Sequence, residues 1–171
     1  MTGAAETDRL RAALADAMDH TAERPDIPFP ARYAGVYADR RRECGWQLYD
    51  AVGVTRGDRA GSQAQMLENF RFFGAPHVAV ITTEADLGAY GVLDCGAFVT
   101  GFALAAEALD IATIPQAAPA AYAPFLRRFF GLPDTRQVLC VISLGLADKD
   151  HPANGFRTTR APLAEVLSRR D

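Results

Sequence analysis

Two short runs rich in β-branched residues constrain the fold of this chain more than any other feature. Pro76 to Thr82 reads PHVAVIT and Val138 to Leu146 reads VLCVISLGL, and each has the length and composition of a buried strand. Between them, Tyr90 to Leu109 is rich in Ala, Leu and Phe on nearly every face, which predicts a helix buried on most sides, in a core or at a subunit interface. Strands separated by helices indicate an α+β or α/β sandwich, with these two strands at the centre of its sheet.

Helical spacing and turn residues predict the other elements. Apolar residues recur at helical spacing behind Thr7, which can act as the N-cap of a first helix, and Asp58 can cap a helix that runs to Phe73 before Gly74. The remaining predicted elements are a proline-rich connector at 24–30, a helix at 36–52 ended by Gly53, a strand at 111–114, a helix at 120–130 and a terminal helix at 162–169.

Composition bounds the class of protein. With 171 residues and 49% apolar residues, the chain is expected to form one globular domain over residues 1–171. A net charge of -3 predicts no nucleic-acid or membrane partner, and the run Arg40 to Arg42 beside acidic residues is most simply a solvated helix face. The N-terminus lacks the features of a signal peptide, and Cys95 to Leu109 falls short of the about 20 residues that span a bilayer. Three dispersed cysteines fit a soluble protein of the reducing cytoplasm.

Four stretches, taken in order, resemble the FMN-dependent nitroreductase family. They are NFRFFGAPH from Asn69, DCGAFVTGFALAAEAL from Asp94, IPQA from Ile114 with FGLP from Phe130, and SLGLADKDHPANGFRTTRAPL from Ser143. Each piece is weak alone, but their succession covers the chain from about Arg9 to its end. The resemblance implies an α+β fold in which helices sandwich a mixed sheet, an obligate homodimer, and two FMN molecules in clefts at the subunit interface.

The resemblance also implies that the chain starts inside the family domain. Met1, Thr2 and Gly3 stand where the family has a Val-Thr-Gly-like turn, so the arginine and serine segment that grips the FMN phosphate and ribose would lie upstream. Three interpretations are open: a truncated paralogue, a partial product, and a gene whose start was assigned at an internal valine codon. The last is the favoured hypothesis.

The loop formed by Ile114, Pro115, Gln116 and Ala117 matches the family's loop along the isoalloxazine ring. The resemblance implies that a backbone amide there, that of Gln116, donates to flavin N5, while the Gln116 side chain matters little. Local sequence alone would favour an ordinary turn between a strand and a helix. The matched flanks favour the flavin loop instead.

Two arginines near the C-terminus are the candidate phosphate ligands. Arg160 matches the basic residue of the family's C-terminal loop that meets the FMN phosphate, and Arg157 precedes it in the same loop. A guanidinium suits this role because its rigid fork of donors can bind two phosphate oxygens. Without the resemblance, both arginines would be interpreted as solvated surface. Asn154, followed by Gly155, is expected to shape the loop.

Other candidate residues carry weaker signals. Phe98 lies in the helix that approaches the flavin face in the family, which makes it a candidate substrate-cleft residue, although packing is the simpler role for it and for Phe72 and Phe73. The three histidines lack metal-ligand spacing and Cys95 has no indicated base, so neither a metal site nor a catalytic side chain is predicted.

The activity implied by the resemblance is a ping-pong reaction. NADH or NADPH would reduce FMN, and the reduced flavin would pass electrons to a nitroaromatic, a quinone or a similar small acceptor. Two alternatives stay open: a non-catalytic flavin-binding or scaffold protein of the same fold, and an incomplete fragment without stable activity of its own.

Overall fold

The computed structural model describes residues 1–170, which form two compact units. The first unit contains residues 1–31 and 63–147, and the second contains residues 32–62 together with those from 148 onward. The first unit holds the sheet and its cores, and the second holds α2 and the C-terminal loop. A single domain over residues 1–171 stays a prediction.

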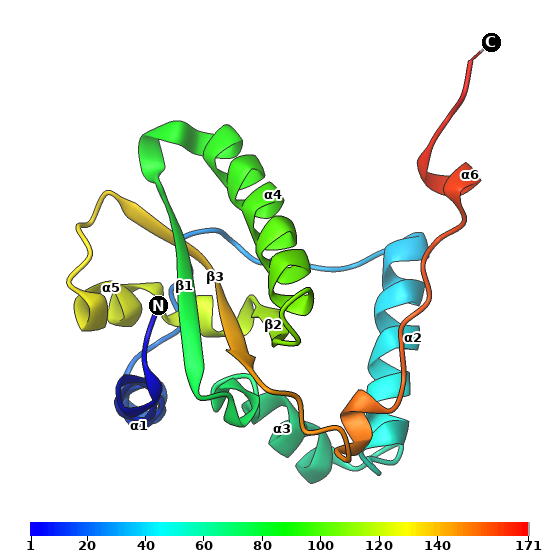
Figure 1. The fold of residues 1–171 in the computed structure, drawn as a ribbon, viewed down its shortest axis with the longest axis horizontal. Coiled ribbons are helices and arrows are strands. Elements are labelled where there is room, and N and C mark those ends of the chain that lie inside the picture. Colours follow the sequence, from blue (N-terminus) through cyan, green and yellow to red (C-terminus); the bar gives the residue numbers. More distant parts are fainter. Residues whose placement is uncertain (171) are drawn as a thin grey trace. The chain divides into compact units, whose positions relative to one another are not determined.

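The sheet has three strands, β1 (His77–Glu84), β2 (Ala112–Gln116) and β3 (Arg136–Gly145). β3 lies in the middle, and β1 and β2 each pair with it antiparallel (Figure 1). The α+β class and all three predicted strands are therefore confirmed. Of the two strands expected at the centre, β3 lies there, whereas β1 lies beside it at the edge of this three-stranded sheet.

Alternation of side chains along β1 and β3 gives the sheet two apolar faces. Val78 and Val141 belong to one core cluster, whereas their neighbours Ala79 and Ile142 belong to another. Val141 and Ile142 are fully buried, which is expected for a central strand covered on both sides.

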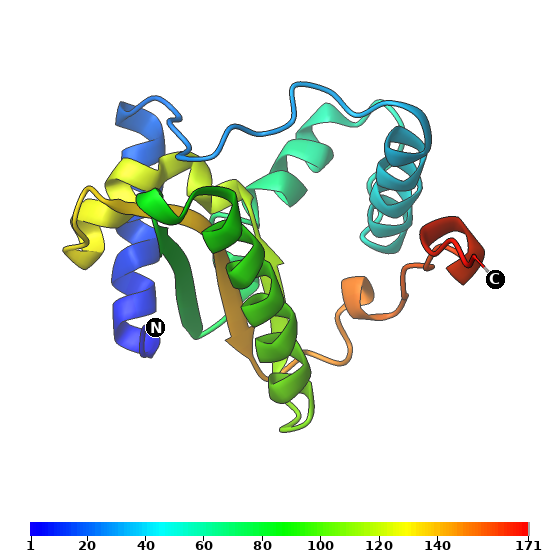
Figure 2. The same ribbon diagram turned by 90° about the horizontal axis from the view of Figure 1, so that it is seen from above.

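Helices α1 (Ala4–His20) and α5 (Ala123–Phe130) cover the first face of the sheet (Figures 1 and 2). Leu10 and Leu14 of α1 and Leu126 of α5 are completely buried in this core. Each fully buried side chain of this size stabilises the fold by roughly 1.5–3 kcal/mol relative to an exposed one.

The first helix begins before the predicted N-cap. Thr2 N donates to the carbonyl of Val78 at 2.8 Å, so the chain leaves the edge of β1 and turns into α1 with Gly3 as its N-cap. Thr7 lies inside the helix, where its hydroxyl donates to the carbonyl of Gly3 at 3.1 Å and shares a hydrogen bond with the Thr2 hydroxyl at 2.7 Å. The N-cap prediction was wrong because this hydrogen bonding depends on a strand far along the chain.

Helix α4 (Gly88–Glu107) packs on the opposite face of the sheet. Val99 and Phe102 are half-buried there against the second core cluster. Within α4 only Gly91 and Ala106 are buried, so the single chain does not bury this helix on most sides, and the core alternative of the prediction is not confirmed. The other half of that prediction, a subunit interface, is not affected.

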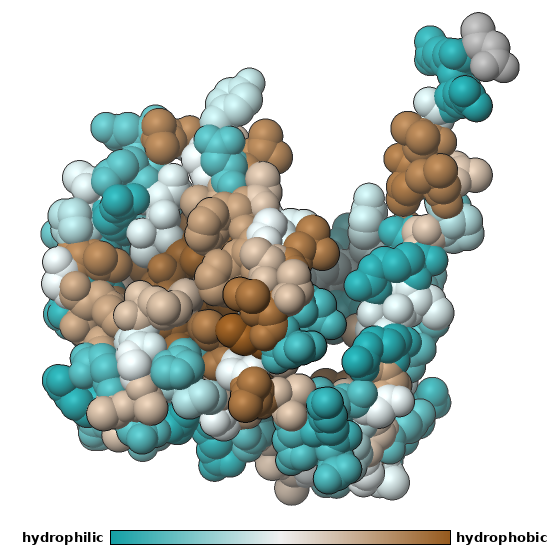
Figure 3. Space-filling view, viewed as in Figure 1, coloured by the Kyte–Doolittle hydropathy of each residue, from teal (hydrophilic) through white to brown (hydrophobic). Residues whose placement is uncertain are grey.

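The outer face of α4 exposes a group of large apolar side chains. Figure 3 shows apolar side chains gathered over this helix. One segment, Ala85–Glu107, is long and apolar enough to cross a membrane by length and composition, which is weak evidence when it stands alone. The exposed residues at and around α4 are Leu87, Tyr90, Leu93, Phe98, Leu104 and Leu109.

Helix α3 (Arg59–Leu67) starts as predicted and ends early. Asp58 Oδ1 accepts a hydrogen bond from the amide of Gly61 at 2.8 Å, which confirms the cap. The predicted continuation to Phe73 is wrong, because Phe72 and Phe73 adopt left-handed φ angles that a right-handed helix cannot contain.

The connector at 24–30 contains neither helix nor strand and bends at residues 26 and 27, which agrees with the absence of helix predicted from its prolines. It is fastened to the first unit by the half-buried carboxylate of Asp26, which accepts hydrogen bonds from Val138 N at 2.8 Å and from Arg127. Arg24 N also donates to the carbonyl of Ala121 at 2.7 Å. The path of the connector is therefore fixed as far as Asp26.

The second unit contains α2 (Gly35–Ala51) and α6 (Leu163–Val166). Arg40 of α2 and Glu165 of α6 form an exposed ion pair at 3.1 Å. The run at 40–42 lies on an exposed helix face, as interpreted from its charge pattern. α6 is shorter than the predicted helix at 162–169, because Leu167 is already extended.

Candidate functional site

The four residues that the resemblance assigned to a flavin loop, Ile114–Ala117, lie at the end of β2, and we call them the β2 loop although the first three belong to the strand. β2 pairs with β3 on one side only, and Pro115, which has no backbone N–H, suits such an edge strand. Ile114, Pro115 and Ala117 are exposed, whereas Gln116 is only 2% exposed. The strand end therefore offers an uncharged, exposed surface made of backbone and small or apolar side chains.

The Gln116 side chain points away from that surface and joins three elements in the core. Its Nε2 donates to the backbone carbonyl of Asn69 at 2.8 Å and lies 3.4 Å from Asn69 Oδ1. Its Oε1 accepts a hydrogen bond from the hydroxyl of Ser143, a residue of β3 that is 1% exposed. The side chain, expected to matter little, is thus hydrogen-bonded at both ends of its amide.

Asn69 opens a turn over residues 69–75 that we call the left-handed turn. Phe72, Phe73 and Gly74 follow one another with φ angles of 56°, 50° and 73°. Such angles are unfavourable for residues with a Cβ, and they persist where the surrounding structure holds them. Phe72 is completely buried in the first core, which confirms its predicted packing role.

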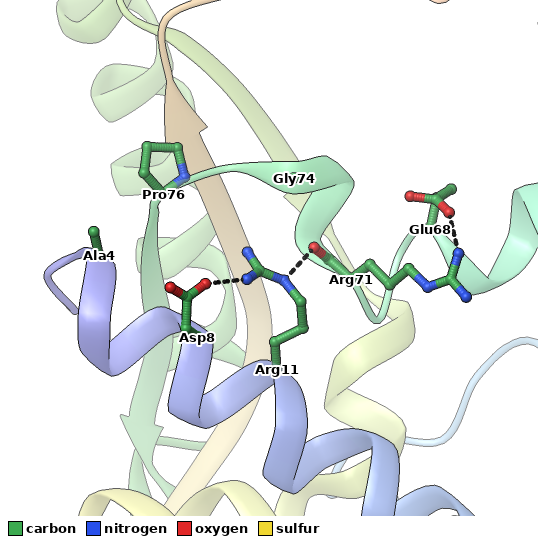
Figure 4. A pocket seen from close by; sticks show the side chains of 7 residues that line it. All are labelled: Ala4, Asp8, Arg11, Glu68, Arg71, Gly74 and Pro76. Carbon is green, nitrogen blue, oxygen red and sulfur yellow. Dashed lines mark hydrogen bonds and ion pairs between the residues drawn. The ribbon is translucent and has the colours of Figure 1, made fainter.

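Arg11 of α1 also holds the left-handed turn, through two backbone carbonyls. Its Nε donates to the carbonyl of Arg71 at 3.0 Å (Figure 4), and its Nη2 donates to the carbonyl of Ala75, also at 3.0 Å. Arg11 also pairs with Asp8, and Arg71 pairs with Glu68 at 2.7 Å. These residues line a pocket of about 450 Å³ in which both guanidinium groups have carboxylate partners.

Arg157 and Arg160 lie in an exposed loop of the second unit. Arg157 donates to the carbonyls of Asn154 and Phe156 at 2.8 Å, and Arg160 donates to the hydroxyl of Thr158 at 2.7 Å. Within residues 1–170, neither guanidinium forms an ion pair with a carboxylate. The two arginines therefore keep donors for an anion, and the β2 loop belongs to the other unit.

Phe98 is 57% exposed on α4, with its ring centroid 6.1 Å from that of Phe102. Helix α4 packs against both β1 and β2. Phe98 thus lies on the helix next to the strand that carries the β2 loop, and its role as a substrate residue stays a prediction.

Other residues considered from the sequence have local structural contacts. Asn154 Nδ2 donates to the carbonyl of Asp148 at 2.7 Å, which fits the expected loop-shaping role. His77 Nδ1 lies 3.2 Å from the carbonyl of Thr2, and Cys95 is half-buried on the side of α4 that packs against the second core cluster. Among residues 1–170, no group of three or more His, Cys, Asp or Glu side chains could hold a metal ion.

Sequence reasoning did not assign roles to Asn69, Ser143 or Arg11. Asn69 and Ser143 each stand first in one of the matched stretches, and this was the signal that could have drawn attention to them. Arg11 gave no signal, because it lies among the charged residues of an amphipathic helix.

The model of the Nitroreductase family matches residues 2–146 of this chain. A nitroreductase called NfnB from Mycolicibacterium smegmatis is 38% identical over 169 residues, which are 97% of this chain and 70% of that protein. A 4-nitrobenzoate reductase from Pseudomonas putida is 30% identical over 151 residues, which are 88% of this chain and 66% of that protein. The chain therefore spans about two thirds of the length of these relatives.

A solved structure agrees with the same likeness. The crystal structure of the FMN-dependent nitroreductase NfnB from Mycobacterium smegmatis in complex with NADPH matches with a TM-score of 0.93 at 34% identity. The match covers 99% of this chain and 77% of that one.

Proposed function

Because this chain belongs to the nitroreductase family, we propose that it is an FMN-dependent NAD(P)H oxidoreductase. By this proposal it works by a ping-pong reaction that reduces a nitroaromatic, a quinone or a similar small acceptor. The observation that carries the proposal is the likeness, over nearly the whole chain, to a protein described as an FMN-dependent nitroreductase and solved with NADPH.

The residues present fit an FMN molecule in two respects. The exposed, uncharged end of β2, with Ile114, Pro115 and Ala117, suits contact with a flat ring system, and the backbone amide of Gln116 is the donor proposed for flavin N5. Arg157 and Arg160 form no ion pair within residues 1–170, so their donors can meet a phosphate.

In this proposal the residues of the protein bind and orient FMN and the acceptor, and none of them acts as a catalytic acid or base. The chemistry that FMN supplies when bound is acceptance of a hydride from NAD(P)H and passage of the electrons to the acceptor. The β2 loop would fix the position of the ring edge, and Arg160 with Arg157 would hold the phosphate. Phe98 would shape the cleft for the acceptor and exclude water from it.

The proposal includes a homodimer in the cytoplasm, without nucleic-acid or membrane partners. The exposed apolar side chains on the outer face of α4 support a second copy as the covering partner, because a surface of this kind is costly to leave in water. A non-catalytic scaffold of the same fold is not favoured, since the relatives that match most of this chain are named as reductases.

The test is reconstitution of the purified chain with excess FMN, followed by desalting and anaerobic addition of NADPH or NADH. Retained flavin whose absorbance is bleached by either donor is the expected result. Arg160→Ala should weaken FMN retention at least about tenfold, because a hydrogen bond to a charged group contributes about 1.5–3 kcal/mol.

Arg42→Ala is the matched control, because Arg42 is also an exposed arginine of the second unit but is paired with Asp39. This variant should retain FMN like the wild type. Loss of all flavin from the wild-type chain on desalting would contradict the proposed function.

A further inference from the structure

Gln116 is the buried residue among exposed ones at the end of β2. The residue as a whole is 2% exposed, whereas its neighbours Pro115 and Ala117 are exposed. A buried amide is costly unless its donors and acceptors are satisfied. Here Ser143 donates to the Gln116 oxygen, and the Gln116 nitrogen donates to the carbonyl of Asn69.

The carbonyl that accepts from Gln116 opens the left-handed turn. Three consecutive left-handed residues, two of them phenylalanines, need contacts that hold them in place. Arg11 supplies two hydrogen bonds, to the carbonyls of Arg71 and Ala75. Gln116 supplies one at the other end of the turn, to the carbonyl of Asn69. The turn is therefore held between α1 on one side and β2 on the other.

From this geometry we propose that the side chain of Gln116 is a positioning residue for the flavin site. It ties the β2 loop to the left-handed turn and to Ser143 of β3, so that the depth of the loop against the core is fixed before any cofactor binds. The effect is exerted through the backbone of residues 114–117, and the side chain itself touches neither cofactor nor substrate. The inference rests on the proposed function and adds a residue to its machinery.

Gln116→Met tests the proposal, because methionine has a similar length and no hydrogen-bonding amide. The first measurement is amide hydrogen exchange of the full chain without flavin. Protection of the amides at 70–75 is expected to fall at least about tenfold, because the carbonyl of Asn69 and the hydroxyl of Ser143 lose their partner.

The second measurement uses the FMN-loaded chain. The dissociation constant of FMN is expected to rise about tenfold, and the midpoint potential of the bound flavin to shift, because the loop backbone no longer has one fixed position. Ser143→Ala, which leaves the bond from Gln116 to Asn69 in place, should produce smaller changes of the same kind. This milder variant also serves if Gln116→Met does not fold.

Thr7→Val is the matched control, because Thr7 is also completely buried and hydrogen-bonded but lies on α1 and contacts Thr2 and Gly3. It should lower overall stability while leaving FMN affinity, flavin potential and the relative protection of 70–75 unchanged. The proposal is overturned if Gln116→Met behaves like Thr7→Val in these readouts. If the wild-type chain binds no FMN, the proposed function fails, and hydrogen exchange still decides whether Gln116 couples the loop to the turn.

Discussion

Burial lowers the reactivity of the Cys140 thiol. Burial, and to a smaller extent the nearby Cys95, raises the pKa of this thiol from its usual 9.0 to about 11. Cys140 pairs with Ile81 across the sheet and packs in the core beneath α4. It is therefore protonated at neutral pH, and a protonated thiol is a poor nucleophile.

The shifted pKa of Cys140 predicts a loss of stability in alkali. Above pH 9 the unfolded chain releases the Cys140 proton, whereas the folded chain keeps it up to about pH 11. The unfolded state then binds fewer protons, so the free energy of unfolding falls as the pH rises through this window. Cys140→Val should reduce the slope, measured by urea unfolding between about pH 8 and pH 11.

Part of the slope should remain in Cys140→Val, because burial also raises the pKa of Tyr122. Cys44 provides the control, since its side chain is exposed. Cys44→Val should keep the wild-type slope, and an unchanged slope in Cys140→Val would contradict the assigned role of burial.

Helix α4 lies close to β1 at Gly91, the buried glycine near its N-terminus. A Cβ added there would collide with the Thr83 hydroxyl and would lie 2.8 Å from Leu87 Cβ. Gly91→Ala should therefore lower the free energy of unfolding by about 1–3 kcal/mol, despite the better helix propensity of alanine. Gly45→Ala on α2 meets nothing within 4 Å and should not lower the thermal midpoint. Equal midpoints for the two variants would contradict the close packing of α4.

Elements with a local signal were predictable, and their ends were less so. The β-branched runs gave β1 and β3, and Asp58 gave the start of α3, because strand composition and caps act over a few residues. The end of α3 depends on the left-handed turn, which Arg11 and Gln116 hold from distant parts of the chain. The start of α1 likewise depends on pairing between Thr2 and β1. No local pattern contains such information.

Some residues of the candidate site could be predicted from consecutive sequence, and others could not, because their contacts join distant parts of the chain. Matched stretches pointed to Ile114–Ala117, Arg157 and Arg160, since a family pattern is a property of consecutive residues. The buried contacts among Gln116, Asn69 and Ser143 join residues from three elements and appear only after the sheet has formed.

At the scale of the whole molecule, the two faces of α4 are unequal. Its inner face packs on the sheet, and its outer face exposes large apolar side chains over most of the helix (Figure 3). In a single chain α4 covers the sheet, but no helix or strand of the first unit covers the outer face of α4. The sequence predicted that this helix is buried either in a core or at a subunit interface. The exposed outer face of α4 favours the subunit interface.

Leu93→Glu tests the proposed dimer at this face. Leu93 is 67% exposed on α4, so a carboxylate there should leave the fold of the single chain intact while making the apolar surface unsuitable for a second copy. We expect the wild type to sediment as a dimer and Leu93→Glu as a monomer with an unchanged far-ultraviolet circular dichroism spectrum. Ala15→Glu adds the same charge on an exposed position of α1 and should remain dimeric. A dimeric Leu93→Glu would mean that the outer face of α4 does not form the interface, because burying an unpaired carboxylate in an apolar contact costs several kcal/mol.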